Sequence, residues 1–184
     1  STLDVELRNY YGPTEAVVSA THHPVVPASG HPIEPIGRPN TNVDAHVLDD
    51  RLEVVADGLV GELYLGGKQL ARGYLDRAAM TAAHFVADPF GGPGARMYRT
   101  GDIVRWYVDA DGGLTLGYGG RSDDQIKLRG QRIELGEIES VLASAPGVVH
   151  VAVVVATAPG GGEQLVAYVA GRPGDDVDLD AVRN

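Results

Sequence analysis

Alternation of apolar and polar residues, together with short apolar runs, predicts strands along most of the chain. Side chains of a strand point alternately to its two faces, so this pattern is typical of half-buried strands. Arg129-Gly130 separates two of the predicted strands, and the glycine-rich loop at residues 159–162 separates the last two. The predicted strands cover residues 3–7, 43–48, 60–65, 103–108, 125–128, 131–134, 148–156 and 164–170.

A helical period is present in fewer places. From Leu135 onward, apolar residues recur at positions 138, 141, 142 and 145, which predicts a helix that Pro146-Gly147 ends. Asp76 is a candidate N-cap for a helix that runs to about Val86 and ends before Asp88-Pro89. Residues 175–180 are an acidic start to a further helix. Residues 27–39 are rich in proline and glycine and predict a loop. The expected fold class is therefore mixed α/β (α+β), with a β-rich part followed by a small α/β part.

Composition narrows the possible classes of protein. With 184 residues the chain is long enough for one domain or for parts of two. Its net charge of −10 disfavours nucleic acid and anionic membranes as partners. The absence of cysteine excludes disulfides, thiolate metal sites and cysteine nucleophiles. The apolar runs are too short to span a bilayer, and no secretion signal is present at the start. We expect a piece of a longer polypeptide, because the chain begins without methionine and ends within a pattern.

Two short segments carry the residue types of a nucleotide site. After the first predicted strand, the Gly12-Pro13 turn is flanked by Tyr11, Thr14 and Glu15. A ring, a hydroxyl and a carboxylate could stack on a base, bond a phosphate and hold Mg²⁺. Asp102, which follows a glycine at a strand edge, could accept hydrogen bonds from two ribose hydroxyls. Taken alone, the first segment is equally well explained as an ordinary turn with a helix cap, and Asp102 is better explained as an ordinary turn residue.

The segment Gly120–Glu139 joins a polar turn, the two strands around Gly130 and the start of a helix. Lys127, Arg129 and Arg132 place cations near Gly130, where a partner could approach the backbone closely. On composition alone the segment is simply a charged, solvent-exposed hairpin.

Four segments in order resemble core motifs five to eight of the amino-acid adenylation domains of nonribosomal peptide synthetases. Residues 9–15 (NYYGPTE) are similar to the fifth motif, and residues 98–102 (YRTGD) are similar to the seventh. Residues 61–64 (GELY) and 71–75 (ARGYL) are similar to two parts of the sixth motif. Residues 120–139 are similar to the eighth motif. Pro13-Thr14-Glu15 and residues 134–137 match the amino-acid-activating branch. Acyl-CoA ligases and luciferases usually carry methionine–threonine–glutamate and a proline-containing segment at these places.

The resemblance implies a fold, a reaction and a division of the chain. Residues 1–122 would be the C-terminal part of a large, β-rich adenylation core. Residues 123–184 would be the hinge and a partial, mobile small C-terminal domain. Such domains join an amino acid to ATP and pass the aminoacyl group to the phosphopantetheine thiol of a carrier protein.

The resemblance also implies roles for individual residues. Tyr11 would stack on adenine, Thr14 would bond a phosphate, Asp102 and Arg121 would bind ribose, and Tyr118 would line the nucleotide site. Thr14, Glu15 and Lys127 would have catalytic roles, and Glu15 would also be the Mg²⁺ ligand. Lys127 and Gly130 would face the site only after the small domain rotates about a hinge at Asp123. Three positions match the amino-acid pocket: Tyr10, Val18 and Ser19.

The implied partners are an amino-acid substrate, a peptidyl carrier protein, neighbouring synthetase domains and a small MbtH-like helper protein, in the cytoplasm. The glycine-rich phosphate loop, the aspartate that grips the substrate's amino group and the adenylate-stabilising lysine do not occur in this sequence. The 184 residues alone are therefore not expected to adenylate an amino acid. The alternative function is a degenerate, non-catalytic adenylation-like scaffold or interaction module.

Overall fold

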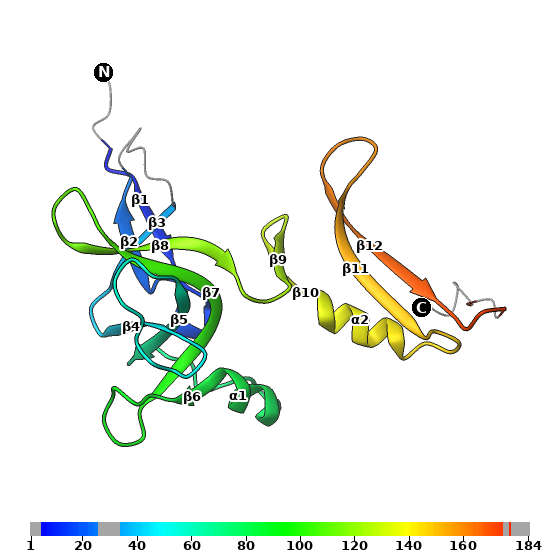
Figure 1. The fold of residues 1–184 in the computed structure, drawn as a ribbon, viewed down its shortest axis with the longest axis horizontal. Coiled ribbons are helices and arrows are strands. Elements are labelled where there is room, and N and C mark those ends of the chain that lie inside the picture. Colours follow the sequence, from blue (N-terminus) through cyan, green and yellow to red (C-terminus); the bar gives the residue numbers. More distant parts are fainter. Residues whose placement is uncertain (1–4, 26–33, 175–176, 178–184) are drawn as a thin grey trace. The chain divides into compact units, whose positions relative to one another are not determined.

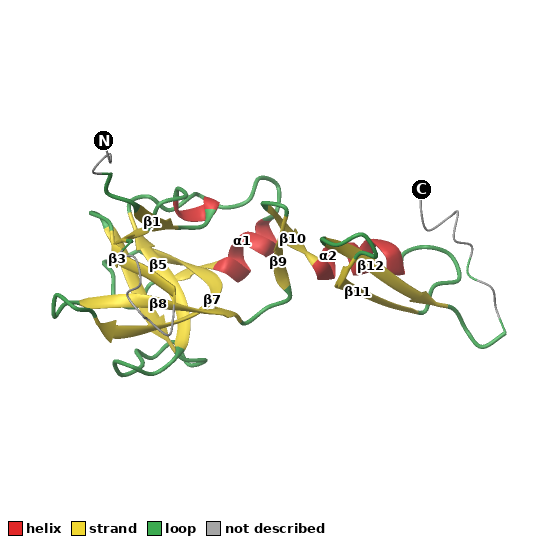
Figure 2. Cartoon of the chain, turned by 90° about the horizontal axis from the view of Figure 1, so that it is seen from above, coloured by secondary structure: helices red, strands yellow, loops and turns green. Residues whose placement is uncertain are grey.

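The computed structural model describes residues 5–25, 34–174 and 177, except for the side chains of Glu34 and Lys127. The chain divides into two compact units, Ser1–Ser122 (unit 1) and Asp123–Asn184 (unit 2). Figures 1 and 2 show that unit 1 is built mainly from one sheet, whereas unit 2 has two short hairpins and a helix. The architecture is a sheet-rich mixture of strands and helices, so the expected fold class is confirmed.

Unit 1 contains an eight-stranded antiparallel sheet. Seven strands follow the order β1-β2-β3-β8-β7-β5-β4, and β6 pairs with β7 beside this path. A 3₁₀ turn, η1 (Thr14–Ala16), follows β1, and a short helix, α1 (Ala78–His84), precedes β6. The strands are β1 (Arg8–Tyr11), β2 (Thr21–Pro24), β3 (Glu34–Pro39), β4 (Val43–Leu48), β5 (Gly61–Gly67), β6 (Phe85–Ala87), β7 (Arg96–Val108) and β8 (Leu114–Arg121).

The central strands form the core of unit 1 and fix the backbone on which the site is built. Leu63, Leu65, Val104 and Leu116 are fully buried, on β5, β7 and β8. Burying a side chain of this size stabilises a fold by about 1.5–3 kcal/mol relative to leaving it exposed. In the β7–β8 ladder Asp102 lies opposite Arg121, so the register of these two strands brings an acid and a base together.

Strand β7 begins at Arg96 rather than at the expected residue 103, so Asp102 lies within the strand and not at its edge. The structure corrects three further expectations for unit 1. The first described strand is Arg8–Tyr11 rather than residues 3–7, because residues 8–11 pair with β2; residues 1–4 lie outside the described part. Glu34–Pro39, expected to be loop, is strand β3 between β2 and β8. At Gly37 φ is +88°, and a Cβ atom would lie 1.8 Å from the carbonyl oxygen of His22. Glycine therefore lets this proline-containing segment join the sheet.

The third correction concerns the helix expected from Asp76 to Val86. It covers only Ala78–His84, and its N-cap is Arg77 without a side-chain hydrogen bond. Asp76 has a φ of +54°, whereas an N-cap residue needs an extended backbone. The apolar residues after His84 belong to strand β6, which pairs with β7 and buries Phe85.

The elements expected in unit 2 are confirmed within the described residues. They are β9 (Gln125–Leu128), β10 (Gln131–Glu134), α2 (Leu135–Ala143), β11 (His150–Thr157) and β12 (Glu163–Ala170). Helix α2 ends at Ala143, three residues before Pro146, with Ser144 as its C-cap. The helix expected at residues 175–180 lies outside the described residues except for Val177. No helix in the described part of the chain is both long and apolar enough to cross a bilayer.

Candidate functional site

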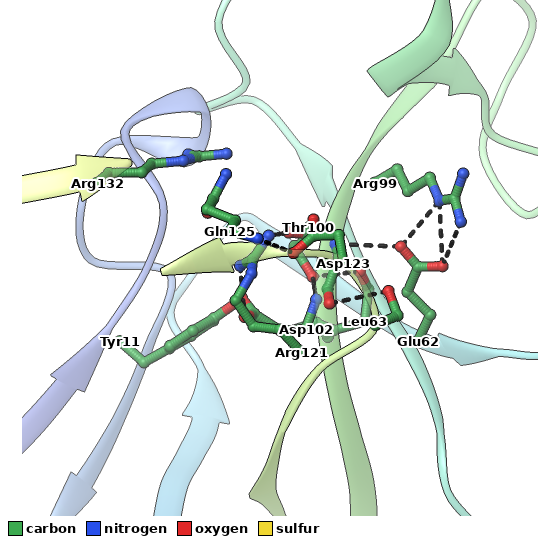
Figure 3. Close-up of polar contacts among 12 residues, drawn as sticks. Tyr11, Glu62, Leu63, Arg99, Thr100, Asp102, Arg121, Asp123, Gln125 and Arg132 are labelled. Atoms are coloured by element: carbon green, nitrogen blue, oxygen red, sulfur yellow. Dashed lines mark hydrogen bonds and ion pairs between the residues drawn. The ribbon is translucent and has the colours of Figure 1, made fainter. Parts of the chain in front are cut away.

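Three of the predicted site residues meet in unit 1, although they belong to three different motifs. Tyr11 ends β1, Asp102 lies in the middle of β7, and Arg121 ends β8. Figure 3 shows the three side chains directed toward one another. We call Tyr11, Asp102 and Arg121 the polar cluster. Neither the spacing of these residues nor any one motif indicates this contact.

The Asp102 carboxylate is the centre of the polar cluster. Arg121 Nη1 donates to Asp102 Oδ1 at 2.7 Å, and the Tyr11 hydroxyl donates to Asp102 Oδ2. The Asp102 side chain is only 8% exposed and that of Arg121 is 18% exposed. Away from water such a pair is held by short, charge-assisted hydrogen bonds, so both groups keep defined positions.

The backbone beneath the polar cluster is held by Thr100. Thr100 Oγ1 donates to the carbonyl oxygen of Leu63 at 2.7 Å and accepts a bond from the amide of Asp102 at 3.0 Å. Arg121 Nη2 donates to the carbonyl oxygen of Thr100 at 3.1 Å. Thr100 therefore joins β5 to both charged members of the polar cluster.

Glu62 supports the same stretch of β7 from the neighbouring strand. Its carboxylate receives three hydrogen bonds from Arg99, two from Nε at 2.9 and 3.1 Å and one from Nη2 at 3.0 Å. The amide of Gly101 donates to Glu62 Oε1 at 3.1 Å. The contact fixes the backbone just before Asp102.

Burial of its hydroxyl raises the pKa of Tyr11 well above its ordinary value, and the negative charge of Asp102 raises it further. Tyr11 is therefore protonated at neutral pH and acts as a hydrogen-bond donor to Asp102. The sequence implied only a stacking role for its ring; the contact of its hydroxyl comes from the structure.

Glu15 lies in η1 and is 7% exposed. Its Oε1 atom accepts a hydrogen bond of 2.6 Å from the hydroxyl of Tyr74. Burial, followed by this bond, raises the pKa of Tyr74, which thus stays protonated. A buried carboxylate whose orientation is held by a neutral donor is suited to binding a cation.

The remaining residues of the first segment lie around η1 on the surface of unit 1. Thr14, Tyr10 and Val18 are exposed, and Ser19 is half-buried. Asn40 Nδ2 donates to the carbonyl oxygen and to Oγ of Ser19, at 2.8 and 3.1 Å. Val18 has a φ of +63°, and the residue before it is also left-handed. A left-handed backbone is rare for β-branched residues, and such strain is concentrated at binding sites.

The other predicted residues are in three places. Tyr118 is half-buried on β8 and packs against the core of unit 1. Asp123 is the first residue of unit 2, and its Oδ1 atom accepts a bond from the amide of Gln125 at 3.2 Å. Lys127 lies on β9, and its side chain is outside the described part of the structure.

Tyr74, Thr100 and Glu62 support the predicted site but were not assigned a role from the sequence. Tyr74 and Thr100 form hydrogen bonds with predicted site residues, whereas Glu62 accepts a hydrogen bond from the amide of Gly101, next to Asp102. Tyr74 and Glu62 lie in the two segments that resemble the sixth motif, which was noted without a function. Thr100 lies in the seventh. Each of these residues is polar and lies inside a recognised motif, which is the signal in the sequence that could have indicated a role. The partner of each residue is visible only in the fold.

The chain is similar to a known family of enzymes in sequence. The family described as AMP-binding enzyme matches residues 2–75. Phosphinothricin tripeptide synthetase PhsB of Streptomyces viridochromogenes is 52% identical over 179 residues, which are 95% of this chain and 14% of the relative. The chain thus spans only about a seventh of the length of this relative.

Solved structures agree with the sequence comparison. PA1221, a nonribosomal peptide synthetase protein with adenylation and carrier domains, matches with a TM-score of 0.74 and 34% identity, over 91% of this chain and 33% of that chain. The four-domain synthetase AB3403, solved with AMP and glycine bound, matches with a TM-score of 0.56 and 39% identity, over 95% of this chain and 13% of that chain.

Proposed function

Because this chain belongs to the adenylation domains of nonribosomal peptide synthetases, within the AMP-binding enzyme family, we propose that the polypeptide containing it activates an amino acid. In the first step the amino-acid carboxylate attacks the α-phosphorus of ATP, and pyrophosphate leaves. In the second step the phosphopantetheine thiol of a carrier protein attacks the aminoacyl carbonyl, loses its proton, and AMP leaves. The observation that carries the proposal is the polar cluster, which joins three separate motifs in one buried arrangement.

The nucleotide would bind at the polar cluster. Carboxylates accept and guanidinium groups donate, so Asp102 and Arg121 supply both types of contact for ribose hydroxyls. A carboxylate has about four acceptor positions, so contacts within the cluster and contacts to a sugar are compatible. Tyr11 would stack on adenine and Tyr118 would line the site. The AMP bound in AB3403, whose sequence and fold are similar, supports this ligand class.

Mg²⁺ would bind at Glu15, next to a phosphate held by Thr14. Mg²⁺ is usually held by one or two carboxylates together with substrate phosphates, rather than by a set of protein ligands. The described residues fit this mode: they contain no group of three or more acidic or histidine ligands, but Glu15 offers one buried carboxylate. When bound, the ion would neutralise charge on the phosphates during the first step.

Transfer to the carrier protein would use unit 2. Ser122 is still bonded to unit 1, because its amide donates to the carbonyl oxygen of Gly101 at 2.8 Å. The next residue, Asp123, begins unit 2, which supports a hinge there. We therefore assign residues 1–122 to the C-terminal part of the core and residues 123–184 to the hinge and small domain. Lys127 would face the nucleotide after rotation about the hinge.

The amino acid and the protein partners follow from the same family. Tyr10, Val18 and Ser19 would form part of the amino-acid pocket. The joined adenylation and carrier domains of PA1221 support a peptidyl carrier protein as partner. We also propose that neighbouring synthetase domains and an MbtH-like helper protein are partners, and that the polypeptide acts in the cytoplasm.

The test is amino-acid-dependent exchange of pyrophosphate into ATP by the full-length polypeptide. We expect exchange with one amino acid or a small set of them. Asp102→Asn should weaken ATP use, because a carboxylate that accepts hydroxyls becomes an amide that also donates. The matched variant Asp111→Asn changes the same group on the exposed β7–β8 loop and should leave exchange intact. A correctly folded polypeptide that binds neither ATP nor any amino acid would instead indicate the non-catalytic scaffold.

A further inference from the structure

Glu15 is held by a residue that lies 59 positions later in the sequence. The hydroxyl of Tyr74 donates to Glu15 Oε1 at 2.6 Å, and the amide of Ala71 donates to the carbonyl oxygen of Glu15 at 2.8 Å. The segment Ala71–Tyr74 therefore bonds both the side chain and the backbone of the proposed Mg²⁺ ligand.

Tyr74 is itself placed by its surroundings. Its amide donates to Thr81 Oγ1 at 2.9 Å, which ties it to helix α1. Its ring contacts Phe85 edge-on, with 5.7 Å between ring centroids, and His84 in the same way at 6.1 Å. Gly73 has a φ of +145°, and a Cβ atom there would lie 2.4 Å from Thr81 Cγ2. Glycine is needed for Tyr74 to approach the helix this closely.

The rest of the segment is fixed to β7 by Arg96. Its guanidinium group donates to the carbonyl oxygens of Arg72 and Ala71, at 3.0 and 3.3 Å. The same guanidinium lies over the ring of Phe85, 5.5 Å from the centroid. Helix α1, strand β6 and strand β7 thus all contribute to the position of the Tyr74 hydroxyl.

A carboxylate that binds a cation has to be oriented. The terminal torsion of glutamate is broad and roughly two-fold, so packing of the stem does not set the plane of the carboxylate. A hydrogen bond to one oxygen does set it. The Tyr74 hydroxyl supplies that bond, to Glu15 Oε1 at 2.6 Å. Partners of this kind, which bond a metal ligand rather than the metal, typically contribute 10–100-fold to metal affinity.

We propose that Tyr74 is a positioning residue, which orients the Glu15 carboxylate for the divalent cation. The inference rests on the proposed role of Glu15 and assigns a purpose to the segment Ala71–Tyr74. The Tyr74 hydroxyl touches neither the cation nor the substrate in this role.

The test uses Tyr74→Phe in the full-length polypeptide, which removes one oxygen atom and keeps the ring. The matched control is Tyr64→Phe, which removes a hydroxyl from a tyrosine of β5 that is 4% exposed and packs with Leu48 and Met97. Pyrophosphate exchange is measured against Mg²⁺ concentration at saturating ATP. Binding of Mn²⁺ in the presence of ATP, followed by electron paramagnetic resonance, gives a second readout that does not depend on turnover.

We expect the Mg²⁺ concentration for half-maximal exchange to rise about tenfold or more in Tyr74→Phe. The maximal rate at saturating Mg²⁺ should change much less, and Mn²⁺ affinity should fall in parallel. Tyr64→Phe should leave both quantities unchanged. Thr81→Val, which keeps the Tyr74 hydroxyl but removes the bond to its amide, should give a smaller rise and serves if Tyr74→Phe does not fold.

Glu15→Gln separates the two levels of the proposal. If it shifts the Mg²⁺ dependence and Tyr74→Phe and Thr81→Val do not, Tyr74 has no positioning role and only this inference is overturned. If Glu15→Gln itself leaves the Mg²⁺ dependence unchanged, the proposed role of Glu15 is wrong. A lower unfolding temperature for Tyr74→Phe with an unchanged Mg²⁺ dependence would show a purely structural role and would also overturn the inference.

Discussion

Replacing Arg121 by methionine should destabilise unit 1, because it leaves the Asp102 carboxylate buried without its cation. The distance between Arg121 Nη1 and Asp102 Oδ1 is 2.7 Å, and the two side chains are 18% and 8% exposed. Methionine has a similar length and no charge, so the change removes the ion pair and the bond to Thr100 and keeps most of the packing.

Removing one partner of a buried ion pair typically costs about 3–5 kcal/mol. Since Arg121 retains some contact with water, we expect a loss near the lower end, about 3 kcal/mol. The entropy of unfolding is about 2.1 cal/mol/K per residue, which gives about 0.26 kcal/mol/K for residues 1–122. A loss of about 3 kcal/mol should therefore lower the unfolding temperature of unit 1 by about 12 °C.

The chain has a convenient probe for this measurement. Trp106 is its single tryptophan, and it lies on β7 against the core of unit 1. Tryptophan fluorescence during heating or urea titration therefore reports the unfolding of unit 1 without a contribution from unit 2.

Two further variants make the prediction refutable. Arg99→Met breaks the ion pair with Glu62, in which the arginine is 50% exposed, so it should cost less than about 1 kcal/mol. In the double variant Arg121→Met with Asp102→Asn, most of the lost stability should return, because the buried charge is gone. Equal losses for the two arginine variants would refute the argument from burial. Failure of the double variant to recover would show that packing, rather than charge, holds the site.

Three other predictions use different features of the chain. Gly37→Ala should lower the free energy of unfolding, measured in urea, by at least about 2 kcal/mol, because the new Cβ would meet the His22 carbonyl oxygen. The control is Gly58→Ala: Gly58 has a similar φ of +85° but open space around it, so the loss should be clearly smaller. Asp123→Pro in the full-length polypeptide should leave pyrophosphate exchange largely intact and sharply reduce loading of the carrier thiol, because proline fixes φ at a hinge. If exchange and loading fall together, Asp123 is a structural or catalytic residue rather than a hinge. Because the pKa of Tyr11 is raised by folding, its stabilising contribution is present below about pH 10 and is lost as the pH rises further. Tyr11→Phe should flatten the alkaline fall in unfolding free energy, and an unchanged slope would contradict this.

The local pattern of the sequence was sufficient for much of the fold. Strands β4, β9 and β10 begin and end at the predicted residues, and β11 and β12 deviate by at most two. Their hydrophobic period and their turn residues indicate the same structure, so local preference and tertiary structure agree. The predictions that failed concern segments in which the two disagree. Residues 34–39 contain prolines and a glycine, which locally favour a loop, but pairing with β2 and β8 makes them a strand.

The candidate site was predicted residue by residue, but its contacts were not. Tyr11, Glu15 and Asp102 were indicated by their own chemistry, because a ring and two carboxylates suit a nucleotide and its metal, and the resemblance to the family's motifs added Arg121. Nothing in the sequence indicated that the Tyr11 hydroxyl bonds Asp102, or that Tyr74 bonds Glu15.

The sequence by itself determined which side chains could perform the chemistry and which short segments form strands, hairpins and helices. These properties depend on a residue and its near neighbours. Only the tertiary structure decided how the side chains are combined. Tyr11 and Asp102 are 91 positions apart, and Glu15 and Tyr74 are 59 positions apart. Their contacts depend on the order and register of the sheet, which result from the burial of apolar side chains throughout unit 1 and leave no periodic signal at the polar residues themselves.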